Sequence, residues 1–478
     1  MVENEIKEEK KSAKLPKNYE KFIKKIRFTR KKVKKQLNNK EKKNTKRIVK
    51  CNKKILSRKE KGKDIYLKIN EFNTNGKKTV VYFIDSYYPI IDGVVSVLDN
   101  YATYMSEYYN VVVCCPKHKN KTYVSDKYFV LGANSLYFKA QGYDYALPVF
   151  DATFNYYISL LKIDLIHINA PFNMGNFGLE LAKRRNIPSI TTFHSQFRQD
   201  FYKATNSELL SIILSGMIMN VYQNSTTTIT MNEFAAGIMR SYGLKRKKIE
   251  IVPNATSLVY KDFDETLENS ILNKHKIDKN KFNLIFIGRF VKVKNIDFIL
   301  ECIKELRKTH KDFSMIFVGY GPEENAMKKY CAENGLVNNV IFTGKILNED
   351  EKAIIIKNSN LLVFPSTYDT DGIIKIECAC YSVPTICFEN TGVSSGFVNN
   401  ETAFITKNNK EEFVEKLRFI LDNPDIAKQI GDNARKETYI TWKDVGKKLK
   451  VIYDRLLNTK NLKNAKKNKN KTTKKTKI

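Results

Sequence analysis

Residue types that build metal and disulfide sites are scarce in this sequence. Its 478 residues include five histidines and eight cysteines, with no C-x-x-C pair and no histidines grouped at the spacing of metal ligands. A zinc site and a disulfide framework are therefore not expected. We predict a protein without a metal site that works in a reducing compartment.

Long hydrophobic runs are missing as well. The longest apolar stretch, residues 209–222, is interrupted by Ser211, Ser215, Gly216 and Asn220 and is too short to cross a bilayer. The start of the chain has no apolar core of the kind found in signal peptides. We expect a cytoplasmic protein that meets a membrane only peripherally, on its inner face.

Positive charge is abundant but unevenly distributed. Residues 1–78 hold 29 Lys and Arg against 9 Asp and Glu, and residues 459–478 hold 9 against none. The stretch between them therefore carries only +4 of the formal charge of +33. The sequence predicts a nearly balanced globular body with a basic extension at 1–78 and a basic tail at 459–478.

Within that body, apolar runs alternate with segments of helical length. This alternation predicts parallel sheets covered by helices on both faces. Because it occurs in two series, we expect two doubly wound α/β domains facing a cleft, at 79–253 and 280–440, joined by a polar linker at 254–279. Residues 441–458 have apolar side chains at helical spacing and predict an amphipathic helix. Strands are expected at residues 80–84, 111–115, 165–168, 189–193, 227–230, 249–252, 282–287, 313–318, 340–343, 361–364 and 385–388, and helices near 295, 323, 349 and 372.

The most informative segment follows the apolar run 361–364. Residues 368–384, Y-D-T-D-G-I-I-K-I-E-C-A-C-Y-S-V-P, place Asp369, Gly372 and Glu377 at the start of an expected helix. A strand, a glycine loop and a helix start direct backbone N–H groups at an anion such as a diphosphate. Flanking carboxylates accept hydrogen bonds from sugar hydroxyls. The alternative is a solvated helix start, because acidic pairs at this spacing also occur by chance.

Two cations stand at the end of another expected strand. The segment I-F-I-G-R-F-V-K-V-K-N, residues 285–295, offers Arg289 and Lys294 before the next helix. Two positive charges at this place would neutralise a leaving diphosphate. The alternative is solvated surface, since the chain has 84 Lys and Arg residues from which such a pair can arise.

Three further candidates follow expected strands. Gly319 lies in the turn V-G-Y-G-P, Gly93 in Y-P-I-I-D-G-V-V, and His194 in T-F-H-S-Q. Glycine lets the backbone approach a ligand closely, but it also makes an ordinary turn. A histidine at a strand end is either a site residue or a hydrogen-bonded structural one, whereas His167, inside a strand, is expected to be packed.

The spacing Asp369-x7-Glu377 resembles the E-x7-E signature of retaining glycosyltransferases, especially family 4, whose usual form is E-G-F-G-L-V-x-x-E-A. Asp369 stands at the first acidic position, Gly372 at the second glycine, and Ile373 and Ile374 at the L-V pair. Aspartate is one methylene shorter than the usual glutamate. The resemblance extends over residues 79–458 and implies the GT-B fold, with a C-terminal helix that crosses back to the first domain.

The resemblance also implies roles for the candidate residues. It places Arg289 and Lys294 on the donor phosphates, Glu377 on the ribose and Asp369 on the hexose. The donor would be a nucleotide sugar such as a UDP-hexose, bound as substrate, and no cofactor or metal would be needed. Donor contacts are further implied for Gly93, His194, Gly319, Gly372, Ile373 and Ile374.

The sequence leaves the acceptor and the role of the extensions open. The motifs P-x-x-D-G-V and F-P-S-x-Y-D-T resemble those of bacterial enzymes that glycosylate diacylglycerol or build surface glycans, so a lipid or a saccharide acceptor is expected at the membrane. The alternative is a nucleic-acid or anionic-surface binding protein that acts through its basic tails on an inactive α/β scaffold. We expect no specific nucleic-acid partner, because residues 29–63 contain no aromatic side chain that would stack on bases.

The N-terminal extension contains one periodic segment. Apolar residues recur at roughly helical spacing among many Lys and Arg residues. This pattern predicts a basic amphipathic helix that binds an anionic membrane, and the alternative is a solvated Lys-rich tail. The apolar residues are Tyr19, Phe22, Ile26, Val33 and Leu37.

Overall fold

The computed structural model of the chain describes residues 62–475 except 91, 120, 139–142 and 246–247, with side chains up to residue 458. It divides into two units, Met1–Glu71 and Phe72–Ile478. In the first unit, the described residues are helical. The predicted amphipathic helix at residues 19–37 lies outside the described residues, so it stays a prediction.

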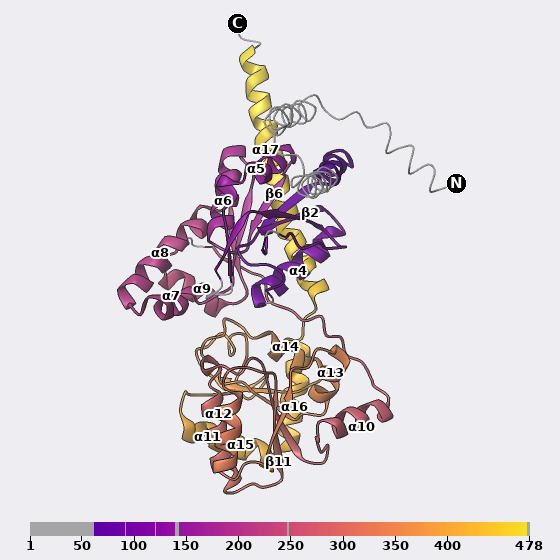
Figure 1. Ribbon diagram of the computed structural model, residues 1–478, viewed down its shortest axis with the longest axis vertical. Coiled ribbons are helices and arrows are strands. Elements are labelled where there is room, and N and C mark those ends of the chain that lie inside the picture. The colour runs from indigo at the N-terminus through magenta and orange to yellow at the C-terminus, as the bar shows by residue number, and fades with distance from the viewer. Residues whose placement is uncertain (1–61, 91, 120, 139–142, 246–247, 476–478) are drawn as a thin grey trace, which may run out of the picture. The chain divides into compact units, whose positions relative to one another are not determined.

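The first sheet of the second unit has seven parallel strands in the order β3-β2-β1-β6-β7-β8-β9 (Figure 1). All residues of β1 are buried, as expected for a strand covered on both faces. The strand order reverses between β1 and β6, and doubly wound sheets bind ligands at such a switch point. The strands are β1 (Thr79–Phe83), β2 (Asn110–Pro116), β3 (Phe129–Ala133), β6 (Leu165–Ile168), β7 (Ser189–Phe193), β8 (Thr227–Thr230) and β9 (Glu250–Ile251).

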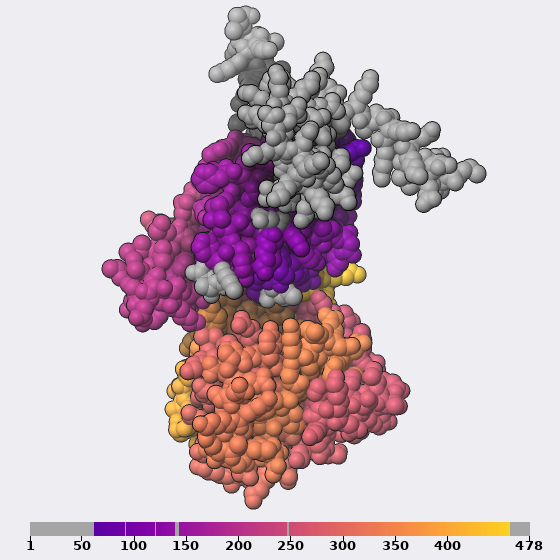
Figure 2. Space-filling view, in the orientation of Figure 1, coloured from indigo at the N-terminus to yellow at the C-terminus, as the bar shows by residue number. Residues whose placement is uncertain are grey.

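Helices cover this sheet, and two of them, α7 and α8, form a magenta lobe that stands out from its side (Figure 1, Figure 2). Helix α4 (Gly93–Ser106) begins after Asp92, whose carboxylate accepts a hydrogen bond from the Val95 N–H at 2.8 Å. This N-cap explains why the helix begins there. An antiparallel hairpin, β4 (Ser135–Phe138) and β5 (Tyr143–Ala146), lies outside the sheet. The other helices are α5 (Ala152–Leu160), α6 (Asn173–Arg185), α7 (Phe197–Thr205), α8 (Glu208–Asn224) and α9 (Glu233–Ser241).

The second sheet has six parallel strands in the order β12-β11-β10-β13-β14-β15. Its order reverses between β10 and β13, so the segments that follow these two strands share the switch point. The strands are β10 (Phe282–Ile287), β11 (Phe313–Val318), β12 (Val340–Gly344), β13 (Leu361–Val363), β14 (Thr385–Phe388) and β15 (Phe404–Thr406). The helices are α10 (Glu265–Lys274), α11 (Ile296–Arg307), α12 (Glu324–Glu333), α13 (Glu349–Lys357), α14 (Ile373–Cys380), α15 (Lys410–Asp422) and α16 (Pro424–Glu437).

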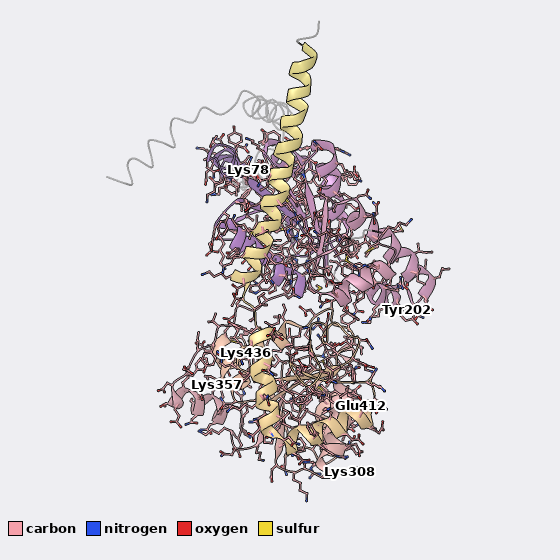
Figure 3. The ribbon with its side chains drawn as sticks, turned by 180° about the vertical axis from the view of Figure 1, so that it is seen from behind. Lys78, Tyr202, Lys308, Lys357, Glu412 and Lys436 are labelled. Carbon is pink, nitrogen blue, oxygen red and sulfur yellow. The ribbon has the colours of Figure 1, made fainter. Side chains whose placement is uncertain are left out.

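The last helix, α17 (Trp442–Lys475), returns to the first sheet and packs its apolar residues into that sheet's core (Figure 3). Buried polar groups reinforce this contact. The hydroxyl of Tyr453 lies 2.5 Å from Nδ1 of His167 and 2.7 Å from the hydroxyl of Tyr82. His167 Nε2 lies 2.6 Å from Oγ1 of Thr192. The expectation that His167 is a packed residue is confirmed, and the network joins α17 to β1, β6 and β7.

We expect Tyr453→Phe to lower the free energy of unfolding by about 1–3 kcal/mol, because it leaves buried polar groups of His167 and Tyr82 without their partner. Urea unfolding of the full chain measures the change. Tyr202→Phe is the matched control, since Tyr202 is about half exposed on α7. Identical unfolding midpoints for Tyr453→Phe and the parent would contradict the prediction.

The predicted fold class, two doubly wound parallel α/β sheets, is confirmed. Strands β6, β7, β8, β10, β11 and β14 have the predicted bounds. The predicted linker at 254–279 contains helix α10, and α17 continues to Lys475 beyond the predicted end at 458. In the described part of the chain, no helix combines the length and the apolar character needed to cross a membrane.

Candidate active site

The loop between β13 and α14 carries the predicted acidic signature. Gly372 is the N-cap of α14 and has a φ of 96°, which favours glycine. A Cβ at this position would also come within 2.7 Å of the Phe364 ring. Glycine is therefore required for the chain to turn from the strand into the helix, and the first N–H groups of α14 have no partner within the helix.

Asp369 in this loop forms an ion pair with Lys294. The Nζ atom of Lys294 lies 2.6 Å and 2.7 Å from the two carboxylate oxygens, and each side chain is 19% exposed. Lys294 ends the short 3-10 helix η2 (Lys292–Lys294), just before α11, and its Nζ lies 5.4 Å from the centroid of the Phe364 ring. Two motifs 75 residues apart in the sequence thus meet at the switch point of the second sheet.

Glu377 lies in the second turn of α14 and pairs with a residue that the motifs did not indicate. Its carboxylate lies 2.9 Å from Nζ of Lys352 on α13, and both side chains are mostly buried. Lys352 follows no strand and belongs to no motif. No signal in the sequence distinguishes it from the many other lysines.

Arg289 and Gly319 lie where the strands of the second sheet end. Arg289 follows β10 and is exposed, and among the described residues no hydrogen bond or ion pair engages its guanidinium. Gly319 has a φ of 144°, and a Cβ there would lie 1.9 Å from the carbonyl oxygen of Gly288. Close packing of two backbone segments explains this glycine, so a donor contact of Gly319 stays a prediction.

The two isoleucines at the start of α14 face different surroundings. Ile373 is partly buried against the core of the first sheet, whereas Ile374 packs on the core of the second. Their side chains are therefore used for packing. A donor contact, as predicted, would have to come from their backbone N–H groups.

Of the two candidates in the first half of the chain, His194 lies beside the acidic loop. It is buried, its Nε2 lies 3.3 Å from Oδ1 of Asn169, and its carbonyl oxygen accepts a hydrogen bond from Oγ1 of Thr370 at 2.7 Å. Burial lowers the pKa of His194 to about 3, so the imidazole is neutral at pH 7. Gly93 is exposed at the start of α4, and a Cβ there would meet no atom within 4 Å.

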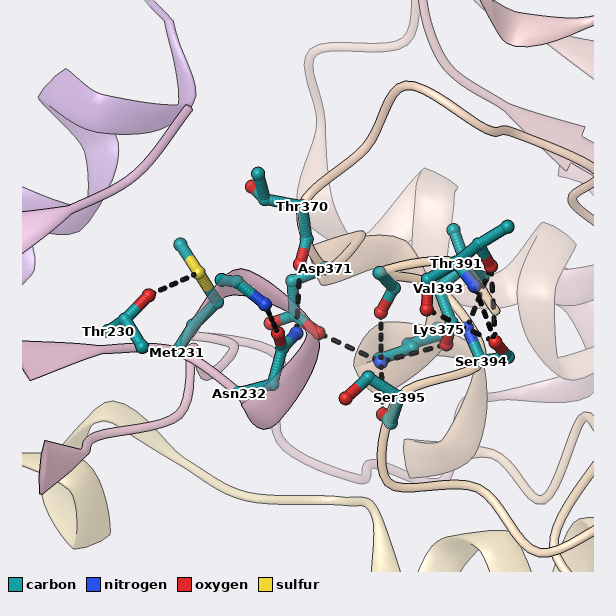
Figure 4. A network of polar contacts seen from close by, with 12 residues as sticks. Thr230, Met231, Asn232, Thr370, Asp371, Lys375, Thr391, Val393, Ser394 and Ser395 are labelled. Carbon is teal, nitrogen blue, oxygen red and sulfur yellow. Dashed lines mark hydrogen bonds and ion pairs between the residues drawn. The ribbon is translucent and has the colours of Figure 1, made fainter. Parts of the chain in front are cut away.

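Two amides of the first half hold the acidic loop through its backbone. Gln196 donates from Nε2 to the carbonyl of Tyr368 at 2.7 Å, and Asn232 donates from Nδ2 to the carbonyl of Thr370 at 2.8 Å (Figure 4). These bonds flank Asp369 on both sides. Gln196 and Asn232 were not among the predicted site residues, although both follow expected strands.

The signature contains a second carboxylate, Asp371, that faces the protein interior. Asp371 and Lys375 are 7% and 5% exposed, and their charged atoms lie 2.8 Å apart (Figure 4). Lys375 Nζ also donates to the carbonyls of Val393 at 2.9 Å and Ser395 at 3.2 Å. Asp371 stands where the family pattern has phenylalanine. Its charge is used internally, whereas Asp369 is partly exposed and pairs with Lys294.

Among the residues that the structure describes, no group of three or more His, Cys, Asp or Glu side chains is placed to hold a metal ion. The site residues described above supply cations, carboxylates and backbone N–H groups.

Two family models match this chain. Residues 91–259 match the model described as Glycosyltransferase Family 4, and residues 268–437 match the model described as Glycosyl transferases group 1. Together the two matches identify the chain as a glycosyltransferase. The glycosyltransferase resemblance drawn from the acidic signature is thereby confirmed; the first matched range contains strands β2 to β9, and the second contains β10 to β15.

This glycosyltransferase is similar to characterised proteins along most of its length. It is 25% identical to the alpha-monoglucosyldiacylglycerol synthase of Acholeplasma laidlawii over 396 residues, which cover 80% of this chain and 98% of that protein. Its fold is similar to that of sucrose-phosphate synthase from Thermosynechococcus elongatus, with a TM-score of 0.65, 17% identity and coverage of 80% and 100% of the two chains. HepE from Anabaena in complex with UDP-glucose gives a TM-score of 0.62 at 12% identity, with coverage of 79% and 99%. These likenesses confirm the GT-B fold.

Proposed function

We propose that this glycosyltransferase is a retaining hexosyltransferase that moves a hexose from a nucleotide sugar, such as a UDP-hexose, to a lipid acceptor without a metal or cofactor. The observation that carries the proposal is the meeting of Lys294, Asp369 and the N-terminal end of α14 at the switch point of the second sheet. A cation and the N–H groups at a helix start can bind a diphosphate, and a carboxylate can accept hydrogen bonds from the hydroxyls of the sugar.

Each group of the site has a role in this scheme. Lys294 and Arg289 neutralise the diphosphate, and the N–H groups of Ile373 and Ile374 add hydrogen bonds to it. Glu377 binds the ribose and Asp369 the hexose. On donor binding, the diphosphate competes with Asp369 for the ammonium of Lys294, which frees the carboxylate for the sugar hydroxyls. The remaining predicted donor contacts follow strands of both sheets: Gly93 and His194 come after β1 and β7, and Gly319 and Gly372 come after β11 and β13.

The transfer step uses the donor phosphate. The bond between the anomeric carbon and the diphosphate oxygen breaks, and the acceptor hydroxyl oxygen forms its bond to the anomeric carbon on the same face. The acceptor proton passes to an oxygen of the leaving diphosphate. Preorganised positive charge at Lys294 and Arg289 stabilises the negative charge that develops on that leaving group.

A lipid acceptor is favoured by the relative that matches most of the chain, whose name describes a synthase of a glucosylated diacylglycerol. A saccharide acceptor is the second candidate, because the motif around Asp369 also resembles that of surface-glycan enzymes. Such an enzyme would work at the cytoplasmic membrane face. A protein that acts only through basic tails would have no use for two glycosyltransferase domains.

We expect the purified full-length chain to turn over one sugar nucleotide in a panel of UDP-glucose, UDP-galactose and GDP-mannose, and to transfer its hexose to diacylglycerol. Glu377→Ala should reduce this transfer by about a hundredfold or more, because one preorganised polar contact in a site is worth a few kcal/mol. Radiolabelled hexose in the lipid extract measures the activity.

Glu333→Ala is the matched control, because Glu333 is an exposed carboxylate at the end of α12. It should keep the activity of the parent. Normal transfer by Glu377→Ala would remove Glu377 from the site. Hexose found in a saccharide and not in diacylglycerol would replace the lipid acceptor by the second candidate.

A further inference from the structure

Up to Met217, helix α8 exposes large apolar side chains and buries small polar ones, whereas beyond it the helix buries the apolar residues Ile218, Met219, Val221 and Tyr222. Leu209 and Met217 are 68% and 66% exposed, whereas Ser211 and Ser215 are fully buried. Both serines satisfy their hydroxyls on helix carbonyls, Ser211 on Glu208 at 2.7 Å and Ser215 on Ser211 at 2.6 Å. In this part of the helix the pattern is the reverse of that of an ordinary surface helix, which turns its apolar side chains to the core and its polar side chains to water. We define the α8 apolar face as Leu209, Leu210, Ile212, Ile213 and Met217, which are all exposed.

The α8 apolar face is also free of charge. No Asp, Glu, Lys or Arg occurs from residue 209 to residue 232. Single exposed apolar residues are common on protein surfaces, but a contiguous group without charge marks an interaction surface. The helix is part of the lobe that stands out in Figure 2.

The α8 apolar face lies close to the acidic loop. Helix α8 packs against α7, and α7 touches the residue that precedes Asp369. The Tyr368 hydroxyl donates to the carboxylate of Asp200, and Nζ of Lys203 lies 4.4 Å from the centroid of the Tyr368 ring. One helix thus separates the apolar face from the proposed hexose site.

The sequence has a run of four cations, K-R-K-K, at residues 245–248, and the first of them, Lys245, contacts the C-terminal end of helix α8. The backbone N–H of Lys245 donates to Oε1 of Gln223, near the C-terminal end of α8, at 3.0 Å. Lys245 and Lys248 are exposed. An apolar helix face with exposed lysines at the end of the same helix is a combination that binds an anionic lipid surface, with apolar side chains at the headgroup boundary and cations on the phosphates.

We propose that α8 lies in the plane of an anionic bilayer, with the α8 apolar face inserted below the headgroups and Lys245 and Lys248 on the lipid phosphates. The inference rests on the proposed function, since it supplies the route by which a lipid acceptor reaches the site. Lying in the plane accounts for a 17-residue helix that exposes apolar residues on one side only. None of these residues belongs to the N-terminal extension at residues 1–78.

The test uses the full-length chain with Leu209→Ser, Ile213→Ser and Met217→Ser combined. Vesicles of phosphatidylglycerol and phosphatidylcholine are co-sedimented with the protein at about 0.5 M salt, where electrostatic attraction of the basic extensions is strongly screened. We expect the partition constant to fall by about tenfold or more, because binding scales with the apolar area inserted. The matched control combines Val259→Ser, Val337→Ser and Leu347→Ser, three comparably exposed apolar residues, and should bind as the parent does.

Activity separates this surface from the active site. The α8 triple variant should turn over the donor and glycosylate a short-chain diacylglycerol in detergent as the parent does, but lose transfer to diacylglycerol in vesicles.

Equal vesicle binding by the triple variant and the parent overturns the proposal. So does a parent dimer that the substitutions convert to a monomer while vesicle binding stays the same, because α8 would then bind a second copy. A parent that turns over no sugar nucleotide refutes the proposed function, while vesicle binding still decides the role of α8. If the triple variant melts earlier than the parent, Met217→Ser alone replaces it.

Discussion

Lys294→Ala is expected to lower hexose transfer by about a hundredfold or more while the full-length chain stays folded. In the structure, the ammonium of Lys294 is held by Asp369 and lies at the switch point of the second sheet. A diphosphate leaving group gains negative charge in the transition state, and a fixed cation in a partly dehydrated site is worth a few kcal/mol to it. Initial rates with the preferred sugar nucleotide measure the loss.

Two controls separate the proposed role from other effects of this change. Lys292→Ala removes an exposed cation from the same short turn and should leave the rate unchanged. Lys294→Ala also leaves Asp369 without its partner. The double variant Lys294→Ala with Asp369→Asn removes that charge, and its activity should stay as low. Recovery in the double variant would show that Lys294 serves only to neutralise Asp369, and parent-like turnover by Lys294→Ala would exclude it from the site.

The strands were the part of the fold that could be predicted best. Strands β10 and β11 are buried along nearly their whole length, so they appear in the sequence as unbroken apolar runs and both of their ends could be placed correctly. Gly372 marked the start of α14 because only glycine fits its backbone angle and its contact with Phe364. Local sequence determined these elements.

Helix α10 could not be predicted because its partners are distant in the sequence. Only Leu272 of this helix is buried, so its apolar pattern is weak. It is held by charged side chains instead: Glu268 pairs with Lys357, and Lys274 lies 2.7 Å from Glu351 of α13. A charged segment held in this way resembles a polar linker until the fold brings the partners together.

The candidate site, too, could be predicted only in part. Asp369, Lys294 and His194 were predicted because each stands next to a strand end, and the structure brings them to one loop. The partners that orient this loop, such as Asn232, come from the other sheet and carry no motif. The buried pairing of Lys375 with Asp371 was not predicted either, since lysine is almost never fully buried unless it is paired.

Substitution of Lys375 has the largest expected effect on stability. Lys375→Met should lower the free energy of unfolding by about 3–5 kcal/mol, because it leaves the carboxylate of Asp371 buried without its counter-ion. The ammonium also joins α14 to the turn at residues 393–395 through two carbonyls, so the acidic loop should loosen and transfer should fall with stability.

Urea unfolding measures the change in the free energy of unfolding. The control Lys328→Met breaks an exposed pair with Glu324 and should lower this free energy by less than about 1 kcal/mol. Lys375→Met combined with Asp371→Leu removes both charges and should regain much of the loss. A stable Lys375→Met protein would mean that Asp371 is solvated or protonated in the folded chain, and the buried pair would then have no part in holding the loop.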